Sequence, residues 1–137
     1  MNNTIMKILQ VVLLLLLGVV GSTDVLSAET IAKKRLGPAK VEPVTIDGVR
    51  YEAIQWGKAR DLDQNGGYIG AYDQNTGKEL WLLKIYDVSY EGDIEDDKQD
   101  IFITRLRQKC GRYLVIENEK GQRFIVDLKT RSIESED

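Results

Sequence analysis

Short runs of alternating apolar and polar residues cover most of the chain, and residues typical of turns separate them. The clearest example lies at residues 44–52, where two strand-forming runs flank the pair Asp47-Gly48. An Asp-Gly pair between two such runs is a strong signal for a β-hairpin. The pattern therefore predicts a hairpin here, with strands at 44–46 and 49–52.

Similar runs predict further strands, which lie at residues 68–73, 80–90, 101–107, 113–117, 123–128 and 131–133. The run at 80–90 begins with apolar residues on both faces, which predicts a central strand covered on both sides. No useful helical period follows residue 28, so we expect an all-β domain. Seven or eight short strands joined by tight turns predict an antiparallel meander that forms a small barrel or a sandwich.

The first 28 residues carry a different pattern, which is typical of a secretory signal peptide. Lys7 precedes an apolar run at residues 8–20, and small residues follow it up to Ala28. The run is shorter than the roughly 18–20 apolar residues that cross a bilayer comfortably. We expect cleavage after Ala28, with Ser22 as the alternative, and contact with the membrane only through this segment before cleavage.

The mature protein is then expected in the periplasm or outside the cell; the alternative is a protein that stays anchored in the membrane by its N-terminus. Residues 29–42 are predicted to form a polar, basic linker, because they contain Lys33, Lys34 and Arg35 before a Gly-Pro pair. A single β domain is expected at 43–134, followed by an acidic tail at 135–137.

The composition narrows the possible chemistry. The chain has no histidine and a net charge of −3. The missing histidine excludes Ser-His-Asp and Cys-His catalysis within this chain, and it removes the commonest transition-metal ligand. A nucleic-acid partner is not expected, because such partners select for a basic excess. The composition therefore favours a protein that is not an enzyme.

The chain has one cysteine, Cys110, so no disulfide can form within it. In an oxidising compartment an odd cysteine is either a free thiol or a bridge between two chains. We therefore expect either a monomer or a dimer linked through Cys110.

Residues 71–81 predict a tightly closed hairpin. Asp73 and Thr76 carry side chains that can hydrogen-bond to turn amides, and Gly77 can supply a positive φ angle. Together with Ala71 and Trp81, they resemble the repeat of the pyrroloquinoline-quinone-type β-propellers. In that family each blade is a four-stranded sheet, and the tryptophan of the repeat docks one blade against another.

A closed propeller needs at least about four blades, and this chain is too short to supply them. The resemblance therefore implies the architecture of the hairpin and not the family's cofactor site. Residues 113–128 look loosely like a second hairpin of the same kind.

Residues 61–66 fit the opening of a calcium-binding loop, D-x-D-x-N-G, in which oxygen ligands alternate before a glycine. At the twelfth position Tyr72 stands where an acidic ligand is expected, and no flanking helices are predicted. The acidic run at 93–100 would supply further ligands if it folds nearby. The alternative is an ordinary polar turn. The candidate calcium ligands are Asp61, Asp63 and Asn65.

These observations predict an exported, non-enzymatic binding or accessory protein that acts through a β surface, by strand addition at an exposed sheet edge. One alternative is an extracellular β module stabilised by calcium at Asp61–Gly66, which is the one case in which a cofactor is expected. The other is a hydrolase that uses two carboxylates, although no pair of acids stands out.

Overall fold

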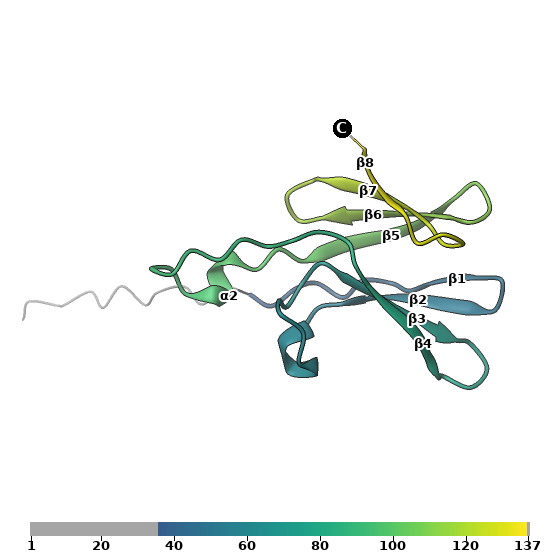
Figure 1. The fold of residues 1–137 in the computed structure, drawn as a ribbon, viewed down its shortest axis with the longest axis horizontal. Coiled ribbons are helices and arrows are strands. Elements are labelled where there is room, and N and C mark those ends of the chain that lie inside the picture. The colour runs from purple at the N-terminus through teal and green to yellow at the C-terminus, as the bar shows by residue number, and fades with distance from the viewer. Residues whose placement is uncertain (1–35, 137) are drawn as a thin grey trace, which may run out of the picture. The chain divides into compact units, whose positions relative to one another are not determined.

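The computed structural model describes residues 36–136, which belong to one compact unit, and it confirms the all-β fold. Two four-stranded antiparallel sheets form this unit, and each is a simple meander (Figure 1). The described strands form no closed barrel. The first sheet contains β1 (Val44–Ile46), β2 (Val49–Ile54), β3 (Tyr68–Asp73) and β4 (Glu79–Lys84). The second contains β5 (Ile103–Lys109), β6 (Tyr113–Asn118), β7 (Arg123–Asp127) and β8 (Ile133–Glu136).

The predicted Asp-Gly hairpin joins β1 to β2. Ile46 pairs with Val49, so the loop has only two residues, and both take a positive φ: 49° at Asp47 and 76° at Gly48. A two-residue loop with both φ angles positive matches the right-handed twist of the strands on either side. This local signal was sufficient to place the hairpin correctly.

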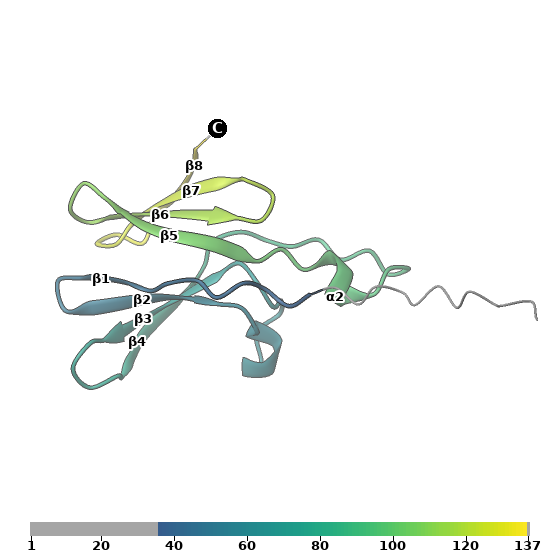
Figure 2. The ribbon, with the colours of Figure 1, turned by 180° about the vertical axis from the view of Figure 1, so that it is seen from behind.

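One hydrophobic core lies between the two sheets. The β1 and β2 strands approach β5, and Figures 1 and 2 show this edge from opposite sides. Burial of these apolar side chains is the main force that holds the two meanders together. The buried members of the core are Ile46, Tyr51, Ile69, Ala71, Ile85, Ile103, Leu106, Leu114, Ile116 and Val126.

The prediction of one long central strand at 80–90 was wrong. The β4 strand ends at Lys84, and it lies at the edge of its sheet, where only β3 pairs with it. Its first residues are also more exposed than predicted, with Leu80 47% exposed. Beyond Lys84 the chain leaves the sheet and runs in an extended, irregular form to Glu91.

The last described strand, β8, covers Ile133–Glu136 and pairs with β7. Ser135 and Glu136, which were expected in an acidic tail, therefore belong to a strand. Their backbone pairs with Phe124 and Arg123. Two short helical segments complete the described part: η1 (Gly57–Arg60) and α2 (Asp96–Gln99).

The two sheets share one turn design. Asp73 ends β3 and Asp127 ends β7, and each carboxylate accepts hydrogen bonds from the backbone N–H groups two and three residues later. In both turns a threonine hydroxyl then accepts a bond from the N–H two residues beyond it. The fifth turn residue has a positive φ, 72° at Gly77 and 61° at Arg131. The third and fourth strands of both sheets are thus joined in the same way.

Trp81 connects the two sheets. Its ring lies 5.8 Å from that of Tyr51 on β2 and 5.1 Å from the guanidinium of Arg131 in the second turn. Trp81 therefore contacts both β2 of its own sheet and the turn before β8 of the other sheet.

The predicted signal peptide and the first half of the basic linker, residues 29–35, lie outside the described residues, as does Asp137. Within residues 36–136, no helix has the length and apolar character that crossing a membrane requires.

Candidate functional site

The extended segment that follows β4 has two contrasting sides. Tyr86 stacks on Phe124 with the ring centroids 5.2 Å apart, and Val88 is buried. Asp87, Ser89 and Glu91 alternate with these residues and line a cleft of about 530 Å³. This is the period of a half-buried strand, although the segment belongs to neither sheet.

The buried side chain of Gln64 takes the place of a neighbouring strand along one edge of this segment. Its Nε2 donates to the carbonyl of Tyr86 at 2.8 Å, and its Oε1 accepts from the N–H of Val88 at 2.9 Å. A second bond, from Nε2 to the carbonyl of Gly66, fixes the amide in place. The side chain of Gln64 is 2% exposed, so these bonds are shielded from water.

The opposite edge of the segment is open. Successive residues of an extended chain direct their backbone groups to opposite edges, so those of Asp87 and Ser89 face away from Gln64. Within residues 36–136, no hydrogen bond is made to the backbone of either residue. The segment therefore presents a free hydrogen-bonding edge beside the cleft.

The far wall of the cleft comes from the turn between β6 and β7, which contributes Lys120 and Gln122. Asn118 shapes this turn, because its Oδ1 accepts the N–H groups of both residues at 3.0 Å. The Lys120 ammonium has no partner among the described residues. Ile94 and Ile101 add the apolar part of the lining.

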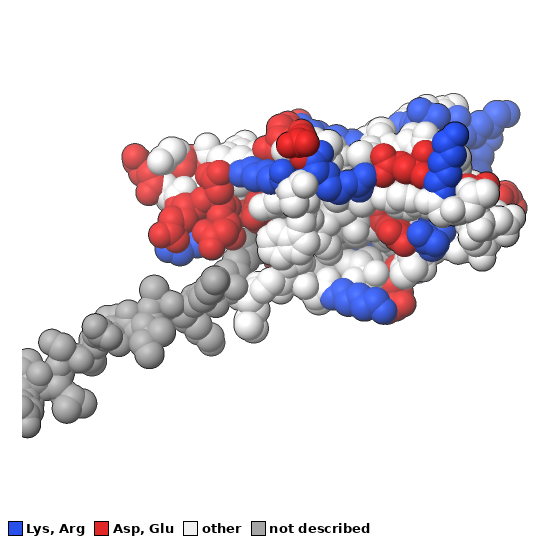
Figure 3. Space-filling view, turned by 90° about the horizontal axis from the view of Figure 1, so that it is seen from below, with Lys and Arg blue, Asp and Glu red and all other residues white. Residues whose placement is uncertain are grey.

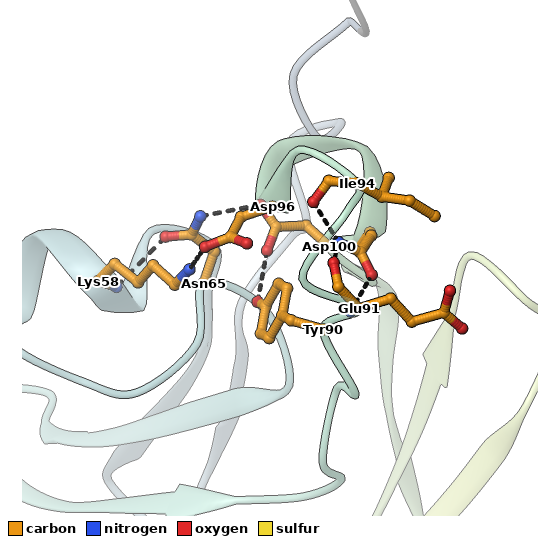
Figure 4. A network of polar contacts seen from close by, with 8 residues as sticks. Lys58, Asn65, Tyr90, Glu91, Ile94, Asp96 and Asp100 are labelled. Carbon is orange, nitrogen blue, oxygen red and sulfur yellow. Dashed lines mark hydrogen bonds and ion pairs between the residues drawn. The ribbon is translucent and has the colours of Figure 1, made fainter.

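The acidic run at 93–100, together with Glu91 just before it, forms the remaining wall and is held by a polar network (Figure 4). Gln99 holds the loop from within: its Oε1 accepts from the N–H of Glu91 at 2.6 Å, and its Nε2 donates to the carbonyls of Glu91 and Ile94. These three bonds close the loop on itself. Figure 4 shows the Glu91 carboxylate directed away from the network, so its charge is available to a ligand.

Buried Asp100 joins this loop to the rest of the unit. It is 3% exposed, and its carboxylate accepts from the Tyr90 hydroxyl at 2.6 Å and from the Asn65 side-chain amide at 2.8 Å. Burial and the neighbouring Asp100 raise the pKa of Tyr90 well above its ordinary value of 10. Lys58 adds an ion pair with Asp96 at 2.7 Å and lies 4.3 Å from the centre of the Tyr90 ring. Figure 3 shows that acidic side chains gather at the end of the unit that carries α2.

Two of the three candidate calcium residues, Asp63 and Asn65, make hydrogen bonds to other side chains or to the backbone. Asp63 accepts from the Tyr68 hydroxyl and lies 2.5 Å from the Lys84 ammonium, and these bonds hold its pKa below the ordinary value. The Asn65 Oδ1 accepts from the N–H of Lys58, and Asp61 is exposed at the end of η1. The acidic run, which was considered as a source of further ligands, does fold beside Asn65, where the Asn65 side-chain amide donates a hydrogen bond to Asp100. No described group of three or more acidic or cysteine side chains is gathered as metal ligands. Calcium binding stays a prediction.

Cys110 lies in the turn between β5 and β6, is exposed, and has a positive φ of 40°. Its thiol is unpaired within the chain, as the residue count requires. A bridge between two chains through Cys110 stays a prediction.

Sequence reasoning did not find the cleft. One signal was present in the sequence, because Tyr86, Val88 and Tyr90 alternate with polar residues at the end of the run at 80–90. The open face of that run lies opposite Lys120, which is close in space only because the second sheet folds back over the segment. Such a contact carries no local sequence pattern.

Comparison with known proteins adds no assignment. No protein-family model matches the chain, and no curated protein is similar to it at a significant level. The resemblance of residues 71–81 to a propeller repeat stays a prediction.

Proposed function

We propose that this chain is an exported binding protein without catalytic activity, and that it holds an extended segment of a partner polypeptide in the cleft beside Asp87–Glu91. The bound segment adds as a strand to the free edge of Asp87 and Ser89. The observation that carries the proposal is this unpaired extended backbone at the side of a cleft. Strand addition gains its affinity from main-chain hydrogen bonds and its specificity from side chains on alternate positions.

The rigidity of the segment supports this mode of binding. Gln64 fixes one edge, and Tyr86 and Tyr90 anchor the buried side through stacking and a hydrogen bond. A segment that is already extended loses little conformational entropy when a ligand binds, which favours affinity.

The charges around the cleft indicate the chemistry of the partner. Glu91 offers a carboxylate on one wall and Lys120 offers an ammonium on the other. Asp87 adds a second carboxylate, although it already lies 2.9 Å from Lys84. The arrangement fits an extended peptide that places a basic side chain beside Glu91 and an acidic side chain or a carboxyl terminus beside Lys120.

The test uses a peptide selected from a displayed random library against residues 34–137, the unit that holds the complete core. The peptide is then titrated into isotope-labelled protein. We expect the amide resonances of residues 87–91 and 119–122 to shift. Methylation of alternate peptide nitrogens should abolish binding, because it removes main-chain donors that strand addition needs.

Two protein variants test the charges. Lys120→Ala and Glu91→Gln should each weaken the peptide roughly tenfold, which corresponds to about 1.4 kcal/mol. Lys129→Ala is the matched control, because Lys129 is exposed on a different turn and should leave the affinity unchanged. Peptides that leave residues 87–91 unshifted, or that bind the Lys120 variant as well as the parent, would show that the cleft is not the binding site.

A further inference from the structure

The described part of the chain begins close to the cleft. Its first residue is Leu36, and a Cβ at the next residue, Gly37, would lie 3.7 Å from the ring of Trp56. The Trp56 ring packs on Phe102 with the ring centroids 5.5 Å apart, and the residue before Phe102, Ile101, lines the cleft. The segment that precedes Leu36 therefore joins the β domain two side-chain contacts away from a lining residue.

The cleft lies on a strongly acidic part of the β domain. Residues 87–100 carry seven acidic side chains and one basic one. Lys58 and Lys120 add two positive charges from other parts of the chain. Lys84 also contacts this stretch, but Asp63 matches its charge. A large negative excess therefore remains, and Figure 3 shows acidic side chains gathered at this end.

The segment before Leu36 has the complementary charge. Residues 29–35 read ETIAKKR, with three basic side chains and one acidic one. They contain neither proline nor glycine, so the whole of this backbone is suited to pairing in a sheet. Alternate residues of a strand share one face, and here that rule joins Ile31, Lys33 and Arg35. One face of such a strand offers an apolar side chain followed by two positive charges.

We propose that residues 29–35 of this chain are the strand that adds to the free edge of Asp87 and Ser89. Seven extended residues span up to about 23–25 Å, which covers the path from Leu36 to the cleft and leaves several residues to pair along it. A short connection also gives an effective concentration in roughly the millimolar range, so weak contacts are sufficient. The inference rests on the proposed strand-addition site and names an occupant for it.

The charges and the apolar side chain of the segment follow the lining of the cleft in order. Counting back from Leu36, Arg35 and Lys33 come first and lie against the acidic run at 93–100. Ile31 comes next and meets the apolar part of the lining. The docked segment occupies the edge that a partner polypeptide needs, so it competes with the partner and lowers its apparent affinity.

Hydrogen exchange in two lengths of the chain tests the proposal. Residues 29–137 are the expected mature protein, and residues 34–137 keep the compact unit but lack Ile31 and Lys33. The amide hydrogens of Asp87 and Ser89 should exchange roughly tenfold more slowly in the longer chain, which corresponds to about 1.4 kcal/mol of docking free energy. This protection should weaken as salt is raised, because exposed charges are screened.

Lys33→Glu is the decisive variant of the longer chain. It places a negative charge against the acidic run and should remove most of the protection at Asp87 and Ser89. Lys34→Glu is the matched control, because it makes the same change of charge one residue along, on the opposite face of the strand. The control should keep the protection. Neither lysine belongs to the hydrophobic core, so the thermal midpoint of the β domain should be the same in both variants.

A peptide selected against residues 34–137 separates this inference from the proposed function. It should bind residues 29–137 more weakly, because the attached segment competes for the same edge. Equal affinity for the two chains, with no protection of Asp87 and Ser89 in the longer one, would overturn the inference and leave the peptide-binding site standing. If no selected peptide shifted residues 87–91 while the longer chain was still protected, the result would count against a foreign partner and support docking of the chain's own segment.

Two further outcomes would overturn the inference. One is protection that persists in Lys33→Glu, because the charges of the segment would then have no part in docking. The other is protection that rises with protein concentration, because the segment would then come from a second copy of the chain.

Discussion

The side-chain amide of Gln64 accepts a hydrogen bond from the backbone N–H of Val88 at 2.9 Å, and it donates to the carbonyl of Tyr86 two residues earlier. One side chain thereby satisfies the two groups that a neighbouring strand would satisfy in a sheet. Gln64 is buried, and a buried backbone group without a partner would be unfavourable. The bonds to Gln64 therefore allow residues 86–88 to lie outside the sheet with both of these backbone groups paired.

Replacing Gln64 by alanine should therefore destabilise the unit. The change leaves the N–H of Val88 and the carbonyls of Tyr86 and Gly66 without a partner, and each buried unpaired group costs about 1–3 kcal/mol. Chemical denaturation should show a loss of at least about 2 kcal/mol. Gln74→Ala is the matched control, because Gln74 is exposed in the turn after β3 and should change stability little. Equal stability of the two variants would contradict the role assigned to Gln64.

The Asp73 turn predicts a dependence of stability on pH. The N–H groups of Thr76 and Asn75 bond to the Asp73 carboxylate and lower its pKa below the ordinary value of 3.8. The native state then takes up this proton at a lower pH than the unfolded chain does. The stabilisation is complete above pH 3.8 and is lost as the pH falls through the lowered native pKa.

Asp73→Asn keeps a side-chain oxygen for these bonds but removes the titrating carboxyl. The thermal midpoint of the parent should fall more steeply below pH 4 than that of the variant, as measured by circular dichroism at a series of pH values. Superimposable profiles for the two proteins would show that the turn carboxylate does not contribute.

The sequence was most informative where structure depends on neighbours along the chain. Asp47-Gly48 marked its hairpin, and residues 68–73 matched β3 at both ends. The turn at Asp127 has the same bonds as the turn at Asp73, yet it was not recognised, because Arg131 stands where Gly77 gives the local signal. A positive φ at arginine is tolerated there within a well-bonded turn, and a propensity rule does not anticipate it.

The errors arose where contacts are distant in sequence. The run at 80–90 was predicted as one strand because its alternation continues through Tyr90, but Gln64 replaces the neighbouring strand after Lys84. The calcium hypothesis considered only the spacing of its oxygens. The sequence did not indicate that Lys84 and Tyr68 would bond to Asp63. Lys120 was not considered as a site residue, because its position opposite Glu91 depends on how the second sheet packs.

Gly66 fixes the contact between the loop at 61–66 and the cleft. A Cβ at this position would lie 2.0 Å from the backbone carbonyl oxygen of Ile101, which lines the cleft. Gly66→Ala must therefore push two backbone segments apart, and overpacking of this kind typically costs about 1–3 kcal/mol. Chemical denaturation should detect this loss. Gly92→Ala provides the control, because a Cβ there meets nothing within 4 Å and should be tolerated. If both variants were equally stable, the close approach at Ile101 would be disproved.

A substitution at Tyr90 tests whether the polar network holds the acidic loop in place. Tyr90→Phe keeps the ring but removes the hydroxyl that donates to buried Asp100 at 2.6 Å. A hydrogen bond to a charged group is worth about 1.5–3 kcal/mol, so the free energy of unfolding should fall by about that amount. Because α2 and residues 91–95 depend on this anchor, their amide hydrogens should also exchange faster than those of β6.

Tyr113→Phe supplies the comparison, because among the described residues the Tyr113 hydroxyl accepts a hydrogen bond only from the exposed Arg112, at 3.3 Å. It should change neither the unfolding free energy nor the exchange of the acidic loop by a measurable amount. The two substitutions remove the same atom, so a difference between them isolates the buried partner. If Tyr90→Phe lowered stability without any faster exchange at residues 91–99, Asp100 would be part of the general core and not the anchor of the loop beside the cleft.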